Sequence, residues 1–203
     1  MKKTVFVVCS IVVALLISAR LSTKAEDHPA IENVLQTPVD ASLANALTIE
    51  DMVNQSDVIA IGSCIETKSV WVDRALVTLA TVSVGETLKG AQLGTITVEL
   101  PGGIDANRAV PVAMTYPGAP SIAPGENVFL FLTATGETAG SYNVAGFSQG
   151  KFSIVNNEDG EPMVTRDLTK TILKDNNGVR RGQSNATPLG ILKAEVKKHL
   201  GGQ

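Results

Sequence analysis

The chain has 203 residues, of which 44% are hydrophobic, and its 17 basic and 20 acidic side chains give a net charge of −3. This length suits a single domain with enough residues to bury a hydrophobic core. Because nucleic acids and anionic lipids repel an acidic chain, the charge argues against nucleic acid as a partner.

Residues 1–25 have the pattern of a cleaved secretory signal peptide. Two lysines precede an apolar run from Val5 to Ile17, and a short polar segment ends at Ala25. The run is shorter than the roughly 20 apolar residues that span a bilayer, so we expect cleavage after Ala25 and no stable membrane span afterwards. An uncleaved membrane anchor is the alternative. The predicted localisation is therefore periplasmic or extracellular.

Cleavage would change the charge and the cysteine content of the chain. Residues 1–25 hold four basic and no acidic residues, so 13 basic and 20 acidic residues would remain, a net charge of −7. Cys9 would leave with the signal, and Cys64 alone cannot form an internal disulfide. Since no histidine lies near it in sequence, Cys64 is predicted to be a buried structural thiol rather than a nucleophile.

The mature chain is predicted to begin with a flexible stretch followed by a short helix. Residues 26–47 contain two Xaa–Pro steps, which favour extended backbone. The segment 47–53 has helical spacing of its apolar residues, and Thr48 can cap its N-terminus. Glu50 and Asp51 would lie at the positive end of this helix dipole.

Apolar segments then predict six β-strands, at residues 57–72, 75–84, 95–100, 127–133, 142–155 and 163–165. The first two are expected to pair antiparallel across a turn at Asp73 and Arg74. In the third, apolar and polar residues alternate, which places one face toward the core. The fifth is expected to be a single strand that bends at Gly146 or Gly150.

The C-terminal part is predicted to be a surface loop followed by a helix. Residues 167–186 are polar, which favours a loop. Thr187 would cap the helix, Pro188 would occupy its first turn, and Gly201 would take a left-handed conformation at its end. The apolar stripe of this helix consists of Leu189, Leu192, Val196 and Leu200.

Together these elements predict a mainly β fold. We expect a small antiparallel OB-like barrel of five to six strands over residues 48–166, because closure removes exposed strand edges. The short N-terminal helix would belong to this domain, and residues 167–203 would add the polar loop and the C-terminal helix. A β-sandwich is the alternative architecture.

Several segments resemble a recurrent group of uncharacterised exported bacterial β-rich proteins. They are Val84–Gly90, Ile96–Gly103, Tyr116–Pro120, Val128–Leu132 and Tyr142–Phe152. The resemblance covers about residues 57–155. It implies export and a β-rich fold, and it carries no assigned chemistry.

A more distant likeness concerns Asp57–Gly62, which follows the export signal, and the strand ending in Leu88–Gly90. This arrangement is similar to netrin-like barrels, which include the tissue inhibitors of metalloproteinases and imply an OB-type barrel. Those inhibitors chelate zinc through an N-terminal cysteine and are rich in disulfides. Here the mature chain would start at Glu26, so the inhibitory chemistry does not transfer with the fold.

The sequence gives no basis for a metal site or a cofactor. Zinc needs three or four ligands at suitable spacing, whereas His28, Cys64 and His199 are widely separated. Residues 156–159 offer oxygen ligands for calcium, but a solvated hairpin loop accounts for them. We therefore expect neither a metal nor a cofactor.

Two weak signals for an enzyme remain. Gly146–Gly150 has the Gly-x-Ser-x-Gly spacing around Ser148, although the strand–turn–helix context of such hydrolases is missing. A carboxylate pair such as Asp105 with Glu126 is the other possibility. Neither signal assigns a catalytic residue.

Residues 101–125 are the candidate binding segment. This segment has four prolines after Pro101 and no predicted element of its own. Loops of this length in compact domains are often lids or binding loops, and a rigid crossover over one end of the barrel is the alternative. The candidate contact residues are Arg108, Tyr116 and Pro117, with Trp71 at the end of the first strand.

These observations favour an exported, non-enzymatic domain that binds a protein or cell-surface partner through its loops. One alternative is a secreted hydrolase that uses a carboxylate pair or Ser148. The other is a structural component of envelope assembly.

Overall fold

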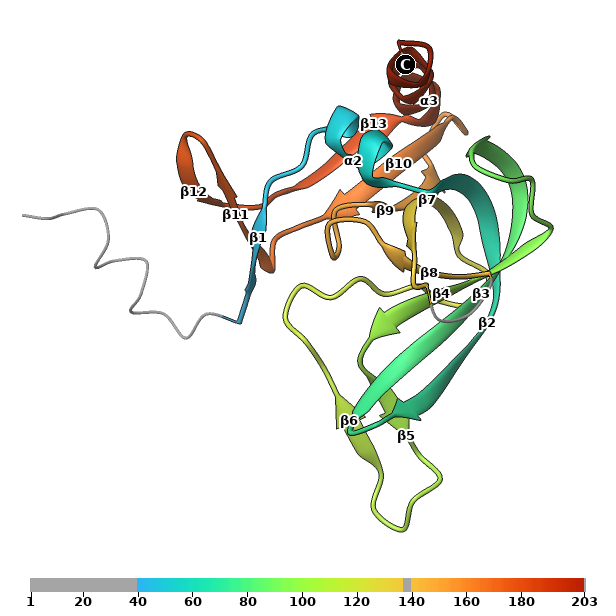
Figure 1. The fold of residues 1–203 in the computed structure, drawn as a ribbon, viewed down its shortest axis with the longest axis vertical. Coiled ribbons are helices and arrows are strands. Elements are labelled where there is room, and N and C mark those ends of the chain that lie inside the picture. The colour runs from blue at the N-terminus through green and yellow to red at the C-terminus, as the bar shows by residue number, and fades with distance from the viewer. Residues whose placement is uncertain (1–39, 137–139, 203) are drawn as a thin grey trace, which may run out of the picture. The chain divides into compact units, whose positions relative to one another are not determined.

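The computed structural model describes residues 40–136 and 140–202, which form a mainly β fold with thirteen strands and two helices (Figure 1). The predicted signal peptide and residues 26–39 lie outside the described residues. The elements are β1 Ser42–Asn45, α2 Ile49–Gln55, β2 Val58–Val72, β3 Ala75–Lys89, β4 Thr95–Pro101, β5 Gly103–Asp105, β6 Val112–Met114, β7 Asn127–Ala134, β8 Ser141–Val144, β9 Lys151–Asn156, β10 Pro162–Asp167, β11 Thr171–Asp175, β12 Gly178–Arg181, β13 Ser184–Pro188 and α3 Leu189–Leu200. Within the described ranges, neither helix has the length and hydrophobicity needed to cross a membrane.

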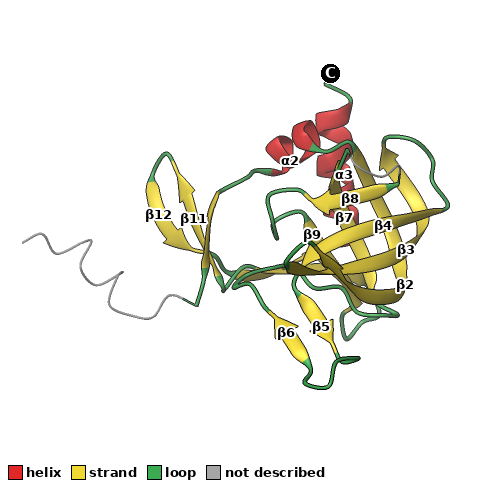
Figure 2. Ribbon diagram, turned by 60° about the horizontal axis from the view of Figure 1, so that its bottom comes forward, coloured by secondary structure: helices red, strands yellow, loops and turns green. Residues whose placement is uncertain are grey.

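The largest sheet has eight strands in the order β13-β10-β9-β7-β2-β3-β4-β8. Strand β7 also pairs with β8, so the pairings β7–β2–β3–β4–β8 return to β7. Within this sheet β4 and β8 run parallel, and the other pairs are antiparallel. Figure 2 shows β2, β3 and β4 as long curved strands beside β7 and β8.

Strands β2 and β3 curve because their pairing is irregular. Register shifts occur between Ile59 and Ala60, between Ile61 and Gly62, and between Cys64 and Glu66. Such bulges bend a strand and increase its twist. Strand β3 continues to Lys89, which pairs with Ile59. The strand is therefore longer than the predicted one, which ended at residue 84.

Strand β7 separates two hydrophobic clusters, which explains its uninterrupted apolar sequence. Val128, Leu130 and Leu132 point into a cluster with residues of β2, β3 and β4. Phe129 and Phe131 point into a second cluster, which α2 and α3 cover with Met52, Val53, Leu192 and Val196. Burial on both faces fixes the position of β7 at the centre of the fold.

Helix α2 begins where the sequence predicts, because Thr48 and Asp51 form a capping box. The Thr48 hydroxyl accepts a hydrogen bond from the Asp51 N–H at 3.1 Å, and Asp51 Oδ2 accepts one from the Thr48 N–H at 2.9 Å. These contacts satisfy backbone donors that the first turn leaves free. The helix of seven residues ends before Ser56.

Helix α3 confirms the predicted apolar stripe but not its predicted ends. Leu192 and Val196 are buried, and both neighbours in the stripe pack against the same cluster. Thr187 is not the cap: it lies in β13 and pairs with Val164, while Pro188 precedes the helix without a side-chain cap. Gly201 has a φ of −79°, a right-handed conformation rather than the predicted left-handed one.

The predicted single strand over residues 142–155 is two strands. β8 pairs with the end of β7 and with β4, whereas β9 pairs with the beginning of β7. Between them the chain turns through Gly146 and Phe147, both with positive φ, of 62° and 66°. The turn lets both strands use the same side of β7, one after the other.

The predicted surface loop over residues 167–186 is wrong, since β11, β12 and most of β13 lie there. β11 pairs with β1 and β12 in a three-stranded sheet, and β13 pairs with β10. All four residues of β12 are exposed, so polar side chains are compatible with strand pairing here. Strand β1 lies in the stretch 26–47, which was expected to be flexible. The segment 101–125, which had no predicted element, contains the β5–β6 hairpin.

Candidate binding pocket

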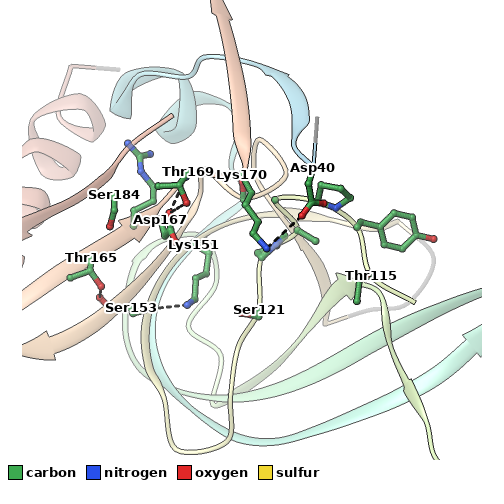
Figure 3. Close-up of a pocket in the computed structure, with 17 residues that line it drawn as sticks. Asp40, Thr115, Ser121, Lys151, Ser153, Thr165, Asp167, Thr169, Lys170 and Ser184 are labelled. Atoms are coloured by element: carbon green, nitrogen blue, oxygen red, sulfur yellow. Dashed lines mark hydrogen bonds and ion pairs between the residues drawn. The ribbon is translucent and has the colours of Figure 1, made fainter. Parts of the chain in front are cut away.

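A pocket of about 450 Å³ lies between the segment 115–121 and strands β9 and β10 (Figure 3). We call it the 115–121 pocket. Ser153 on β9 and Thr165 on β10 are paired neighbours, so the sheet register places both on its wall. Lys151 lies on the same side of β9 as Ser153 because alternate residues of a strand share a face. The wall is therefore polar.

Lys151, Ser153 and Glu126 form one hydrogen-bonded network beside the pocket. The Lys151 ammonium donates to Glu126 Oε1 and, at 2.7 Å, to Ser153 Oγ. Ser153 Oγ donates to Glu126 Oε1 at 2.7 Å, and the Ala123 N–H donates to Glu126 Oε2 at 2.9 Å. This network joins β9 to the end of the 101–125 segment.

The network also lowers the pKa of Glu126. Burial acts to raise the pKa of Glu126, but the hydrogen bonds from Lys151, Ser153 and the Ala123 N–H outweigh it, so the pKa lies below its usual value. Glu126 is consequently a carboxylate at neutral pH.

Arg166 on β10 lines the same pocket and is largely covered by protein. Its Nη1 donates to the Gln149 carbonyl oxygen at 3.0 Å, and its Cζ lies 4.7 Å from the centroid of the Phe152 ring. Its Nε is buried without a hydrogen-bond partner. A buried donor of this kind costs about 1–3 kcal/mol.

No carboxylate among residues 40–136 and 140–202 forms an ion pair with Arg166. Burial, and to a lesser degree the nearby Arg180, lower the pKa of Arg166. Both effects disfavour its positive charge. Arg166 is therefore a desolvated cation with unused donors.

The remaining charged groups of the pocket are better solvated. Lys170 Nζ lies 3.9 Å from Asp40 Oδ2, and both side chains are mostly exposed (Figure 3). Asp167 Oδ1 accepts hydrogen bonds from the N–H and the hydroxyl of Thr169 at 2.9 and 2.7 Å, which lowers the pKa of Asp167. The pocket thus presents both cations and ionised carboxylates.

The four predicted contact residues fall into two groups. Tyr116, with 45% of its surface exposed, and Pro117 line the 115–121 pocket. Tyr116 also lines a second pocket of about 380 Å³, together with residues of β2, β3 and β4. Trp71 and Arg108 line neither pocket; they contact each other and Asp105 at the β5–β6 hairpin.

The residues of the predicted catalytic alternatives have defined contacts in the fold. Ser148 is buried in the turn between β8 and β9, with its Oγ 3.4 Å from Thr171 Oγ1. His199 Nδ1 lies 3.9 Å from Glu50 Oε2, between the two helices. Asp105 and Glu126 have separate hydrogen-bond partners.

Cys64 is buried, as predicted, with 2% of its surface exposed. Its thiol donates to the Glu66 carbonyl oxygen at 3.4 Å. Burial, followed by the nearby charge of Glu126, raises the pKa of this thiol. Within the described part of the chain, no cluster of three or more histidine, cysteine or acidic residues is suited to hold a metal.

Sequence reasoning did not identify Lys151, Ser153 or Arg166. The Lys-x-Ser spacing on a strand is a signal for two groups on one face, but it is common in strands. Arg166 carries no local signal at all. Comparisons of the chain with models of protein families, with curated proteins and with solved structures found no match.

Proposed function

We propose that this protein is an exported, non-enzymatic binding domain that recognises a protein or cell-surface partner through the 115–121 pocket. The observation that carries the proposal is the pocket itself, about 450 Å³ in volume, whose wall on β9 and β10 holds Lys151, Ser153 and Thr165 on one face of the sheet. A concave site with a few placed polar groups is typical of ligand and partner recognition. Tyr116 and Pro117, which the sequence nominates for binding, line the same pocket.

The chemistry of the pocket supports binding over hydrolysis. Activation of a serine requires a base with a free lone pair. Lys151 lies 2.7 Å from Ser153 Oγ, but it donates to that hydroxyl and to the Glu126 carboxylate, and Ser153 Oγ itself donates to Glu126. The Ser148 hydroxyl faces another hydroxyl, that of Thr171.

We further infer that the ring of strands β7–β2–β3–β4–β8 is an OB-like barrel, with a β-sandwich as the alternative. The return of the pairings to β7 supports closure of five strands. The parallel pair β4–β8 supports a non-meandering order within this ring. The 115–121 pocket would then lie beside the barrel, where β9 and β10 continue the sheet.

The test is capture of partners from native cell-surface material by the immobilised protein. Ser121 lines the pocket and is exposed, so Ser121→Trp should fill the pocket without disturbing the core. Gln92→Trp, at an exposed position between β3 and β4, is the matched control. We expect the unmodified chain and Gln92→Trp to retain the same partner and Ser121→Trp to lose it.

Two results would contradict this proposal. One is equal capture by Ser121→Trp and Gln92→Trp, which would place the binding surface elsewhere. The other is turnover in a hydrolase screen that Ser153→Ala or Ser148→Ala abolishes, since that would make the chain an enzyme.

A further inference from the structure

We propose that the second pocket, of about 380 Å³, binds a small uncharged ligand that combines an apolar ring with a hydroxyl group. This pocket is lined by residues of β2, β3 and β4 and by residues of the segment 114–122. The inference goes beyond the proposed function, because it concerns a different pocket and a different ligand chemistry.

The first argument is the wall that the three strands build. Ser69 on β2 pairs with Thr78 on β3, and Thr78 pairs with Leu100 on β4. Directly paired residues place their side chains on the same face of a sheet, and so does Thr67, two residues before Ser69. All four residues line the second pocket. Leu100 also belongs to the first hydrophobic cluster, so the pocket adjoins the core on this face of the sheet.

The second argument is the pair of hydroxyls on this wall. The Ser69 hydroxyl accepts a hydrogen bond from the Ile104 N–H at 3.0 Å, which leaves its own hydrogen to donate. The Thr78 hydroxyl donates to the Gly102 carbonyl oxygen at 2.8 Å, which leaves its lone pairs to accept. A Cβ at Gly103 would lie 2.6 Å from Ser69 Oγ and 2.9 Å from Thr78 Oγ1, so glycine leaves the space beside both oxygens free. A ligand hydroxyl can therefore accept from Ser69 and donate to Thr78.

The third argument is the apolar part of the lining. Leu100 and Ile122 are buried members of the first hydrophobic cluster, and Met114 and Tyr116 line the same pocket. The Leu76 N–H donates to Met114 Sδ at 3.2 Å, which holds this side chain in place. The ring of Tyr116 is half-exposed and has surface available for a ligand. Thioether and aromatic side chains make favourable contacts with rings, and the pocket volume lies within the range of small-ligand sites.

The fourth argument is the charge of the lining. Among residues 40–136 and 140–202, no charged side chain lines the second pocket, whereas Lys151, Asp167 and Lys170 line the 115–121 pocket. A charged group that leaves water without a counter-ion pays a large desolvation cost. The second pocket therefore favours an uncharged ligand.

The test is a titration of the purified protein with benzyl alcohol, benzoate, benzylammonium and glycerol, followed by NMR chemical shifts. We expect saturable binding of benzyl alcohol. Benzoate and benzylammonium, which have the same ring and a charge, should bind at least about tenfold more weakly. Glycerol, which has hydroxyls and no ring, should also bind at least about tenfold more weakly. No binding of benzyl alcohol, or equal affinity for any of the other three probes, would overturn the proposal.

A first variant tests the hydroxyl pair. Ser69→Ala should weaken benzyl alcohol binding about threefold to tenfold, because it removes one hydrogen bond to the ligand. Ser83→Ala, at an exposed serine of β3 outside the pocket, is the matched control and should bind as the unmodified protein does. Equal affinity in the two variants would contradict the role of the hydroxyl pair and overturn the assigned ligand class.

A second variant keeps the proposal falsifiable if Ser69→Ala does not fold. Thr67→Phe should fill the pocket from β2 and abolish benzyl alcohol binding, whereas Thr95→Phe, at an exposed threonine of β4 outside the pocket, should not. Retained binding in Thr67→Phe would place the ligand elsewhere and overturn the proposal. None of these variants changes a residue that lines the 115–121 pocket, so their outcomes are independent of the test of the proposed function.

Discussion

Arg108 lies over the indole ring of Trp71, with its Cζ 4.6 Å from the ring centroid. Asp105 Oδ2 joins the pair by accepting hydrogen bonds from Trp71 Nε1 at 2.8 Å and from Arg108 Nε at 2.9 Å. These contacts tie the β5–β6 hairpin to the end of β2. Two residues that the sequence nominates for partner contact thus have a defined role within the fold.

Asp105→Ala should loosen this hairpin with little effect on overall stability. Trp71 is the only tryptophan, so its fluorescence reports on the cluster directly. We expect emission at longer wavelength as the indole loses Asp105 and Arg108, and little change in the urea midpoint of unfolding, because Arg108 is largely exposed. Asp159→Ala, in the exposed loop between β9 and β10, is the control. An unchanged emission spectrum would show that the cluster does not restrain Trp71.

Glu126→Gln should cost more stability, because it leaves the Lys151 ammonium poorly paired in a mostly buried position. We expect urea unfolding at pH 7 to give a loss of about 1–3 kcal/mol. Glu86→Gln is the matched control: its partner Lys193 and Glu86 itself are more exposed, so the loss should be below about 1 kcal/mol. Equal losses in the two variants would contradict the assigned role of the buried network.

The effect of Glu126→Gln should depend on pH in a defined direction. The folded pKa of Glu126 lies below its usual value, so its contribution is complete above the unfolded pKa and disappears as pH falls through the folded one. The stability difference between the unmodified protein and the variant should therefore shrink only in acid. A difference that grows toward low pH would contradict this linkage.

Local signals in the sequence predict the central elements of the fold. The cap at Thr48 needs only Asp51 three residues later, and the apolar run of β7 needs only burial on both faces. The segments predicted wrongly depend on distant partners. β8 and β9 are separate because both pair with β7, and β11 forms because β1, more than a hundred residues earlier, lies beside it.

The residues of the candidate site also divide into those that a local sequence signal identifies and those that depend on distant parts of the chain. Tyr116 and Pro117 are identified because they lie in a long proline-rich segment without a predicted element, which is typical of a binding loop or of a crossover over one end of a barrel. Arg166 carries no local signal, because the lack of a carboxylate partner for its side chain follows only from the arrangement of the surrounding strands. A sequence shows which charges exist, but it does not show which of them remain unpaired after folding.

The predicted signal peptide can be tested at the N-terminus of the mature protein. If residues 1–25 are a signal peptide, the protein recovered from the periplasm or medium of a bacterial host should begin at or within a few residues of Glu26. Intact mass and N-terminal sequencing measure this directly. Replacing Leu15 and Leu16 in the apolar run with two aspartates should leave the chain uncleaved in the cytoplasm. Full-length protein in the membrane fraction would instead support the uncleaved anchor.

Gly62, the one glycine of β2, should not tolerate an added side chain. An added Cβ would collide with the Ser83 carbonyl oxygen and lie 2.8 Å from Val82 Cγ1, at a register shift that lets β2 and β3 bend together. Since backbone cannot move aside cheaply, Gly62→Ala should lower the free energy of unfolding by about 1–3 kcal/mol. Gly94→Ala, where nothing lies within 4 Å, should change it by less than about 0.5 kcal/mol. Urea unfolding of both variants at neutral pH measures the difference, and equal values would mean that the close approach of β3 at Gly62 is not required for the curved pairing.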